Sequence, residues 1–396
     1  TLKVNGIEHI PKKCPVLLLC NHPSSFTEPM LLACHQHRIL NFLVRGDLFE
    51  NKFLKPILEA TYQIPIYRAR DGFENLRKNK STFQIVYNKL VDQECVLIFP
   101  ESTTQLVRYL RPIQKGAALM AITSVQEYNL IDLVVVPCGV NFTNILKAGS
   151  DAVINFGTPI NINEWLKNHE NEIDLPNKLT ELFTNEMNKV IFSVPSTLSP
   201  EFYDQISSMY NEKEDSSSTL LAKHRNIINA LHYKKETLES LVLAYSNPMS
   251  DVEAVNHAIL DSSSYKFFQI LRSFLNFILG IPSLFLHGTL LLLSRTLAFK
   301  MVKKEFVPPI RILFSVVGIF IVTVILAILI SIHFGIVIGL LSSLASIVSM
   351  LFLLRFIYEA KENKYLFSIN MSKRKKELIA TRNQIIELLN SFASKA

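Results

Sequence analysis

Four short apolar runs in the first 150 residues are each followed by an abrupt change to polar or proline-containing sequence. Continuous apolar runs of this length are typical of strands that are buried on both faces of a sheet. Amphipathic stretches separate the runs. The alternation predicts an α/β domain in which helices cover a largely parallel, mixed sheet. The runs are residues 15–20, 63–67, 95–99 and 133–136.

The polar segments that follow these strands predict a single site. In a parallel sheet the carboxyl ends of the strands form one edge, and ligands bind in the crevice there. His22 follows the first run. Arg68 and Arg70 follow the second run, and Glu101 follows the third. We expect these four side chains to converge at that edge of the sheet.

His22 and Glu28 form a candidate pair for acid–base chemistry. Glu28 lies six positions after His22, beyond a short turn. A histidine that is oriented by a carboxylate acts as a general base toward the hydroxyl of another molecule. A histidine and an acid at this spacing also occur by chance on protein surfaces. The neighbouring polar segments favour the catalytic interpretation.

Together these segments resemble the PlsC-like glycerolipid acyltransferase family. Four blocks occur in the family's order between residues 1 and 165. Glu28 stands where the family usually has Asp, and Ser102 stands where it usually has Gly. The blocks are residues 21–28, 64–68, 99–102 and 136–141, residues 110–116 continue the third, and residues 44–49 resemble the basic segment between the first two.

The resemblance implies transfer of a fatty acyl group from a thioester to an alcohol in one step, without an acyl-enzyme. His22 would take the proton of the acceptor hydroxyl, and Glu28 would hold the imidazole ring. Glu101 would contact the glycerol part of the acceptor. The thioester would be acyl-CoA or acyl carrier protein, and no metal or bound cofactor is implied. The substrate-binding residues would be Arg45, Arg68, Arg70, Glu101, Ser102 and Thr103.

The arginines are candidates for binding a phosphate, because a guanidinium fork binds phosphate in a bidentate manner. Arg68 and Arg70 alternate along an extended segment, so that one of them can point to solvent. Further along, Arg108, Arg111 and Lys115 are expected to be solvated or drawn to lipid headgroups, with phosphate binding as the alternative.

Composition favours a membrane enzyme. The 396 residues are 49% hydrophobic with a formal net charge of +7, which is enough for one α/β domain and a helical membrane region. A basic surface favours anionic lipid headgroups or acidic substrates. No recognition motif indicates a nucleic-acid partner. The five cysteines show no metal-binding spacing and predict reduced thiols in a cytosolic domain.

The last third of the chain predicts membrane helices. Residues 312–354 contain no Asp, Glu, Lys or Arg. About 20 residues span a bilayer, so this run predicts a hairpin of two helices, residues 312–331 and 334–354, with a tight turn near 332–333.

An earlier apolar segment, residues 273–294, is also uncharged, but Gly280-Ile281-Pro282 interrupts it. If it crossed the bilayer, the basic residues between 295 and 311 would lie opposite the catalytic domain. Basic residues favour the cytosolic side. We therefore expect a broken re-entrant or interfacial segment, with three full spans as the alternative.

The expected organisation is a PlsC-like domain (residues 1–200), a helical region with a linker (201–265), the re-entrant segment (266–311), the hairpin (312–354) and a basic amphipathic tail (355–396). The catalytic domain would face the cytoplasm, and its partners would be the acyl donor, a glycerolipid acceptor and membrane lipids. The acceptor would be glycerol 3-phosphate or 1-acylglycerol 3-phosphate. The alternatives are another lysolipid or an aminoacyl lipid as acceptor, or a catalytically inactive lipid-binding or scaffold protein.

Overall fold

The computed structural model divides into two compact units. The amino-terminal unit comprises Thr1–Leu198 with Ser216–Leu221, and the carboxy-terminal unit comprises Ser199–Asp215 with Ala222–Ala396. The structure describes residues 2–67, 73–142, 151–195, 198–211, 215–246, 263–302, 306–369 and 374–393.

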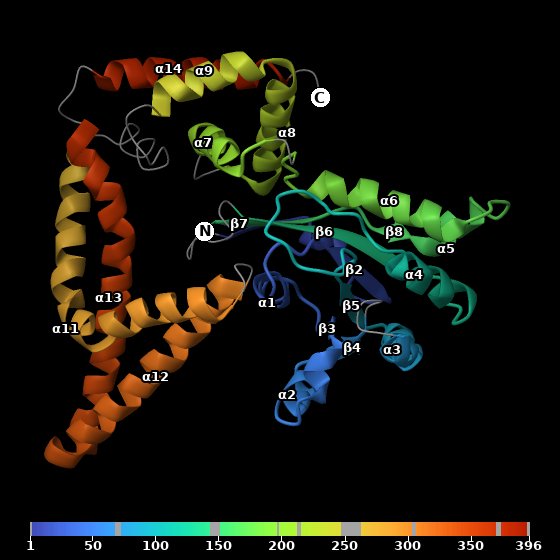
Figure 1. Cartoon of the computed structure of the whole chain (residues 1–396), viewed down its shortest axis with the longest axis horizontal. Helices are drawn as coiled ribbons and strands as arrows, with labels where there is room; N and C mark the ends of the chain where they lie inside the picture. Colours follow the sequence, from blue (N-terminus) through green and yellow to red (C-terminus); the bar gives the residue numbers. More distant parts are fainter. Residues whose placement is uncertain are drawn as a thin grey trace. The chain divides into compact units, whose positions relative to one another are not determined.

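The amino-terminal unit is built on an eight-stranded sheet with the order β1-β7-β6-β2-β5-β3-β4, and β8 pairs with β6 (Figure 1). The β6–β7 and β6–β8 pairs are antiparallel, and the other pairs are parallel. The predicted largely parallel, mixed sheet is confirmed. The strands are β1 (Leu2–Asn5), β2 (Val16–Cys20), β3 (Leu40–Arg45), β4 (Gln63–Ile66), β5 (Cys95–Ile98), β6 (Val134–Phe142), β7 (Ala152–Phe156) and β8 (Ile160–Asn161).

Helices and two short 3-10 segments connect the strands, and the last two helices of this unit follow β8. The helices are α1 (Thr27–Cys34), α2 (Leu54–Ala60), α3 (Phe73–Val91), α4 (Gly116–Gln126), α5 (Ile162–Lys167) and α6 (Leu175–Val190), and the 3-10 segments are η1 (Ile7–His9) and η2 (Gly46–Glu50).

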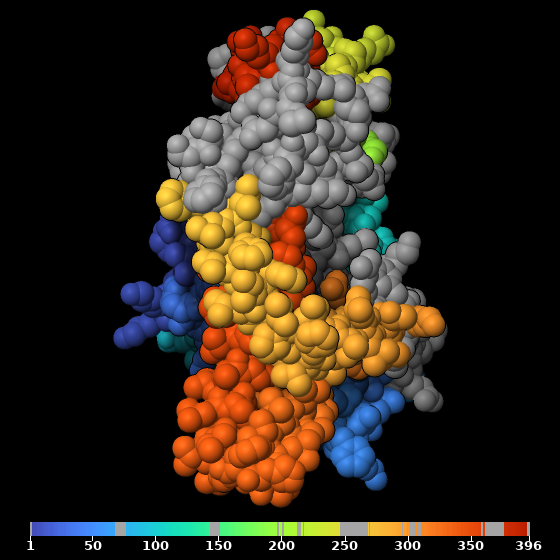
Figure 2. Space-filling model, turned by 90° about the vertical axis from the view of Figure 1, so that its left-hand side faces the viewer, coloured from blue at the N-terminus to red at the C-terminus, as the bar shows by residue number. Residues whose placement is uncertain are grey.

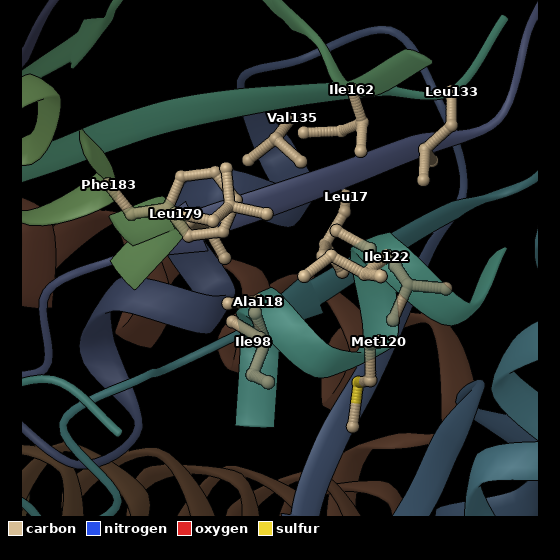
Figure 3. Close-up of a cluster of buried hydrophobic side chains, with 14 of the residues drawn as sticks. Leu17, Ile98, Ala118, Met120, Ile122, Leu133, Val135, Ile162, Leu179 and Phe183 are labelled. Atoms are coloured by element: carbon tan, nitrogen blue, oxygen red, sulfur yellow. The ribbon is translucent and has the colours of Figure 1, made fainter. Parts of the chain in front are cut away.

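Strand β2 is central and contributes to two hydrophobic clusters, which explains its uninterrupted apolar sequence. Successive side chains of a strand point to opposite faces. Leu17 and Leu19 join a cluster with α4 and α6, and Figure 3 shows Leu17 in it. Val16, Leu18 and Cys20 join the other cluster. A strand that is buried on both faces favours apolar side chains along its whole length.

Strand β6 is longer than predicted. The apolar run was expected to end before Pro137, but the strand continues to Phe142. Pro137 lacks an N–H for the sheet, yet its carbonyl oxygen accepts a hydrogen bond from Gly157 N at 2.8 Å. Beyond it, β6 pairs with β7 over Cys138–Phe156 to Phe142–Ala152. Pairing with β7 therefore extends the strand through the proline.

The rest of the described chain is helical. The linker predicted over residues 213–218 lies partly outside the described residues, and its last two positions are helical because α8 begins at Ser217. The helices are α7 (Pro200–Tyr210), α8 (Ser217–Tyr233), α9 (Lys235–Ser246), α11 (Ser263–Met301), α12 (Val307–Phe334), α13 (Ile336–Ile369) and α14 (Arg374–Asn390).

Among the described residues, three helices are long and apolar enough to cross a membrane: Ile270–Ala298, Ile310–Phe334 and Ile336–Ile357. Figure 2 shows part of their surface, coloured from gold to red-orange. The turn between the last two lies at Gly335, two residues beyond the predicted position. Gly335 has φ 90° and ψ 157°, a conformation that a residue with a side chain rarely adopts.

Helix α11 differs from the expected broken segment. It is helical from Ser263 to Met301 with Pro282 inside it, and it changes direction within its length (Figure 1). A proline inside a helix removes one hydrogen bond and produces a kink. The earlier part packs on α13 through Gly280, and the later part packs on α12 through Leu290. The interruption is therefore a bend within one helix.

Candidate active site

The sheet brings His22 and Glu101 together. Strands β2 and β5 are parallel neighbours, with Leu19 opposite Ile98, so that both strands end at the same edge of the sheet. The main-chain N–H of His22 donates to Oε1 of Glu101 at 3.0 Å. The imidazole stacks on Phe99, with ring centroids 4.1 Å apart. The side chain of His22 is thus held at the carboxyl edge of the sheet, 16% exposed.

Glu28 lies beside the ring but is not hydrogen-bonded to it. Nδ1 of His22 is 3.9 Å from Oε1 of Glu28, which exceeds hydrogen-bond distance. The main-chain N–H of Ser24 donates to the same carboxylate oxygen. Glu28 is fully buried in the first turn of α1. The turn places the carboxyl on the Nδ1 side of the ring, so that Nε2 is the nitrogen left for a substrate.

Burial sets the protonation of this pair. Desolvation, and then the charge of Arg111, lower the pKa of His22 to about 3. The imidazole is therefore neutral near pH 7, which is the state that a general base requires. Burial also raises the pKa of Glu28 well above its ordinary value, although the hydrogen bond from Ser24 opposes the shift.

Arg111 is part of this site, contrary to the expectation that it is solvated or drawn to headgroups. It is 8% exposed, and its Nε lies 2.6 Å from Oε2 of Glu101. Its two terminal nitrogens donate to the hydroxyl and carbonyl oxygens of Thr103. A buried carboxylate needs such a partner, since desolvation of an unpaired charge is costly. Burial raises the pKa of Glu101, and Arg111 counteracts this shift.

Ser102 has a backbone conformation that favours glycine. Its φ is 59°, in the left-handed region, and its side chain is exposed. Its N–H donates to the carbonyl oxygen of Phe99 at 3.2 Å, which closes the turn after β5. The preference of the family for glycine at this position therefore has a conformational reason. The hydroxyl of Thr103, the next residue, accepts a hydrogen bond from Arg111, so Thr103 helps to hold the Glu101–Arg111 pair.

The candidate phosphate-binding arginines are placed only in part. Arg45 ends β3 at the same edge of the sheet. Its guanidinium binds both carboxylate oxygens of Asp47, at 3.0 and 2.6 Å, and both side chains are half exposed. A phosphate at Arg45 would have to displace Asp47. Arg68 and Arg70 lie outside the described residues.

Residues next to the site anchor it to β6. The side-chain amide of Asn21 donates to Val140 O at 3.1 Å and accepts from Val140 N at 2.8 Å. On the same strand, Oδ1 of Asn141 accepts from Phe192 N at 2.7 Å. A Cβ atom at Gly139 would lie 2.3 Å from Val190 O. Residues 136–141, the fourth block, therefore hold β6 in place, and β6 in turn holds Asn21, the residue before His22.

This edge thus presents a neutral histidine, a buried carboxyl beside it and a second carboxylate paired with an arginine. In the described ranges, no three His, Cys, Asp or Glu side chains gather in a way that could hold a metal ion. The chemistry that the fold and the side chains offer is proton removal from a bound hydroxyl.

Residues 1–141 match the protein-family model described as Acyltransferase. The matched segment contains the histidine, both carboxyls and Arg111. The predicted resemblance to an acyltransferase domain is confirmed for this segment of the chain.

Two proteins of Saccharomyces cerevisiae are similar to part of the chain. Glycerol-3-phosphate O-acyltransferase 2 is 34% identical over 116 residues, which are 29% of this chain and 15% of that protein. Glycerol-3-phosphate O-acyltransferase 1 is 35% identical over 77 residues, which are 19% of this chain and 10% of that protein. The chain thus covers only a small part of the length of these relatives. The crystal structure of the 1-acyl-sn-glycerophosphate (LPA) acyltransferase, PlsC, from Thermotoga maritima is 16% identical with a TM-score of 0.34, over 47% of this chain and 70% of that chain.

Proposed function

We propose that the chain is a membrane-bound acyltransferase that moves a fatty acyl group from acyl-CoA or acyl carrier protein to a glycerolipid hydroxyl in phospholipid biosynthesis. The observation that carries the proposal is the neutral His22 at the carboxyl edge of a domain of this family. The names of the two yeast relatives favour glycerol 3-phosphate as acceptor, with 1-acylglycerol 3-phosphate as the second candidate.

In the proposed reaction, Nε2 of His22 takes the proton from the acceptor hydroxyl while its oxygen attacks the thioester carbonyl. The thiolate leaves and takes up the proton, so that an ester and a free thiol result and no acyl-enzyme forms. Glu28 orients the ring, which requires the 3.9 Å separation from Nδ1 to shorten when the substrate binds. The reaction needs no metal or bound cofactor, because the chain supplies the base.

Glu101 would bind the glycerol part of the acceptor, with its carboxylate held in place by Arg111. Ser102 and Thr103 form the adjoining turn. The acceptor phosphate would bind to arginines at the same edge, which are Arg45, Arg68 and Arg70.

Substitution of His22 tests the proposal. The full chain in lipid nanodiscs is given a labelled acyl donor and a panel of acceptors, and the acylated products are identified. His22→Ala should lower turnover by about 10²–10⁴-fold, because that is the usual contribution of a general base. His35→Ala is the matched control, since His35 is an exposed histidine in the same unit. Turnover of the His22 variant at the wild-type rate would contradict the mechanism.

One observation favours a second function, a catalytically inactive lipid-binding protein. Glu28 replaces the usual Asp and lies beyond hydrogen-bond distance of the ring. Under this alternative the unmutated chain turns over none of the acceptors but still binds them. Acylation of another lysolipid or an aminoacyl lipid would instead assign a different acceptor to the same chemistry.

A further inference from the structure

The segment after β3 forms a protrusion with exposed apolar side chains. We define this α2 protrusion as residues 46–62, which contain η2 and α2. No residue of α2 is buried. Phe53 is 86% exposed, Ile57 59% and Leu54 41%. Figure 1 shows α2 beyond β3 and β4, at the end of the sheet.

Helix α2 lacks the packed apolar face that usually stabilises a short helix. Seven residues are too few for a stable isolated helix in water, and short helices in proteins depend on a packed apolar face. A cavity of about 550 Å³ lies between α2 and β4, lined among others by Phe49, Tyr62 and Ile64. The side chains of α2 that line this cavity are Lys55 and Glu59, and the exposed fractions of the apolar side chains show that the sheet does not cover them. Adjacent exposed apolar side chains of this size mark an interaction surface.

The charges around the protrusion favour an anionic partner. Three basic and three acidic residues balance within residues 45–62. The beginning of α3 adds Arg77, Lys78 and Lys80, all exposed, and α3 has no acidic residue from Arg77 to its end. Nζ of Lys78 lies 5.2 Å from the ring centre of Tyr67, and this ring packs against Gly46 at the start of η2. Lys78 therefore lies close to the start of the protrusion, and among the described residues Arg77, Lys78 and Lys80 add positive charge beside it.

We propose that the α2 protrusion inserts into the surface of a bilayer that contains anionic lipid. Phe53, Leu54 and Ile57 enter the acyl-chain boundary, and the basic residues at the start of α3 bind headgroup phosphates. Apolar side chains beside basic ones are the features that bind a segment to the plane of a membrane. The candidate membrane spans of the same chain would hold the α2 protrusion near a bilayer.

The position of this surface suggests what it does. Strand β3 delivers Arg45 and then η2 at the edge of the sheet where β2 delivers His22. Insertion would turn that edge toward the lipid, so that a lipid acceptor reaches His22 without leaving the membrane. This use of the surface rests on the proposed function, whereas the contact with lipid does not.

Lipid contact can be measured on the full chain in nanodiscs. Among the five cysteines only Cys34 is exposed, so Cys34→Ser provides a background for labelling. An environment-sensitive fluorophore is attached in the variants Phe53→Cys and Ile57→Cys. Ile173→Cys is the matched control, because Ile173 is an apolar residue of the same unit that is 92% exposed. Lipids with brominated acyl chains should quench the label at positions 53 and 57 and leave the label at 173 unquenched.

A second arm tests the basic residues. In nanodiscs of phosphatidylcholine with phosphatidylglycerol, the combined change Arg77→Gln, Lys78→Gln and Lys80→Gln should reduce quenching at position 53 toward the level at 173. Unchanged quenching would overturn the role of anionic lipid. The same measurement in the His22→Ala chain should give the wild-type result, which separates failure of this surface from failure of the proposed reaction.

Two outcomes would overturn lipid insertion. A blue-shifted but unquenched label at position 53 would mean that protein, from this chain or a second copy, covers the protrusion. An unquenched label with the emission of a water-exposed site would mean that nothing covers it.

Discussion

At the scale of single residues, the buried carboxyl of Glu28 has opposite effects on stability and on the proposed reaction. Burial raises its pKa above the ordinary 4.5. A group whose pKa is raised on folding contributes stability that is present below the unfolded-state pKa and is lost as the pH rises. Ionised Glu28 therefore destabilises the fold above about pH 4.5, while the proposed reaction uses that carboxyl to orient His22.

Glu28→Gln separates these two effects. The variant should melt at a higher temperature than wild type, with a larger difference at about pH 8 than at about pH 4, because glutamine does not ionise. Turnover should fall by about 10²-fold or more, because the ring loses its orienting group. Thermal melts at the two pH values and acyl-transfer rates measure both effects.

Glu28→Asp is the control, since it keeps the charge and should retain at least partial activity. Equal turnover of the wild type and the Gln variant would show that the carboxyl is incidental.

Ser102 makes a second prediction at this scale. A non-glycine residue in the left-handed region costs about 1–2 kcal/mol of stability. Substitution by glycine removes this cost, but part of the gain is lost because glycine increases the entropy of the unfolded chain. Ser102→Gly should therefore raise the free energy of unfolding by about 0.5–1 kcal/mol. Ser102→Ala keeps the Cβ atom and should change stability little. Denaturant titration of both variants measures the difference, and equal stability of the two would contradict the strain argument.

The sequence alone could place some of these residues and not others. His22 and Glu101 follow apolar runs that are typical of buried parallel strands, whose carboxyl ends lie at one edge of a sheet, so their convergence was predictable. Arg111 lies in a loop after Glu101 that has no helical or strand period, and periodicity carries no information about where such a loop folds back. A buried carboxylate at a sheet edge needs a cation. From this requirement a nearby cation could have been predicted, but the sequence does not show whether Arg108 or Arg111 is that cation.

At the scale of elements, local patterns fail where a neighbour decides the outcome. Pro137 is a sound terminator of an isolated strand, yet β6 continues because β7 pairs with its second half. Gly280-Ile281-Pro282 likewise predicts a break, yet α11 remains helical. Helix α13 packs closely against α11 there, since a Cβ atom at Gly280 would lie 2.9 Å from Leu353 Cα. Tertiary packing therefore overrides the local signal in both elements.

This close approach gives a prediction for the α11–α13 pair. Gly280→Ala should destabilise the protein in detergent, because the added methyl group meets the backbone of Leu353 and forces the helices apart. The cost of such overpacking is about 1–3 kcal/mol.

Gly288→Ala is the matched control. It lies in the same helix, and its Cβ would meet only Leu284 of that helix, at 3.4 Å. Both variants gain the same helix propensity, about 1 kcal/mol, so the difference between their melting temperatures isolates the contact. Equal melting temperatures would show that α11 and α13 are not in close contact.

At the scale of the whole molecule, the bend in α11 bears on how the chain crosses the membrane. At about 1.5 Å per residue, residues 270–281 extend about 18 Å and residues 282–298 about 26 Å. Each part is shorter than the ~30 Å hydrocarbon core. A bent helix of this length fits a re-entrant or interfacial segment with both ends on one side, as the basic residues between 295 and 311 predict. In this arrangement the hairpin of α12 and α13 would leave the cytosol and return to it.

Cysteine accessibility in intact cells tests this arrangement. We propose that the acyltransferase domain lies in the cytosol, where acyl thioesters are. A cysteine beside Lys303 should then react with an impermeant reagent only after the membrane is opened, and one beside Lys373 should behave in the same way. A cysteine at His333, next to the turn at Gly335, should react from outside. Charged side chains at the bilayer centre cost at least about 2.5 kcal/mol each, so the basic residues that flank the spans hold these boundaries in place. If α11 crosses the membrane instead, all three results are reversed, because one additional crossing moves every later segment to the opposite side.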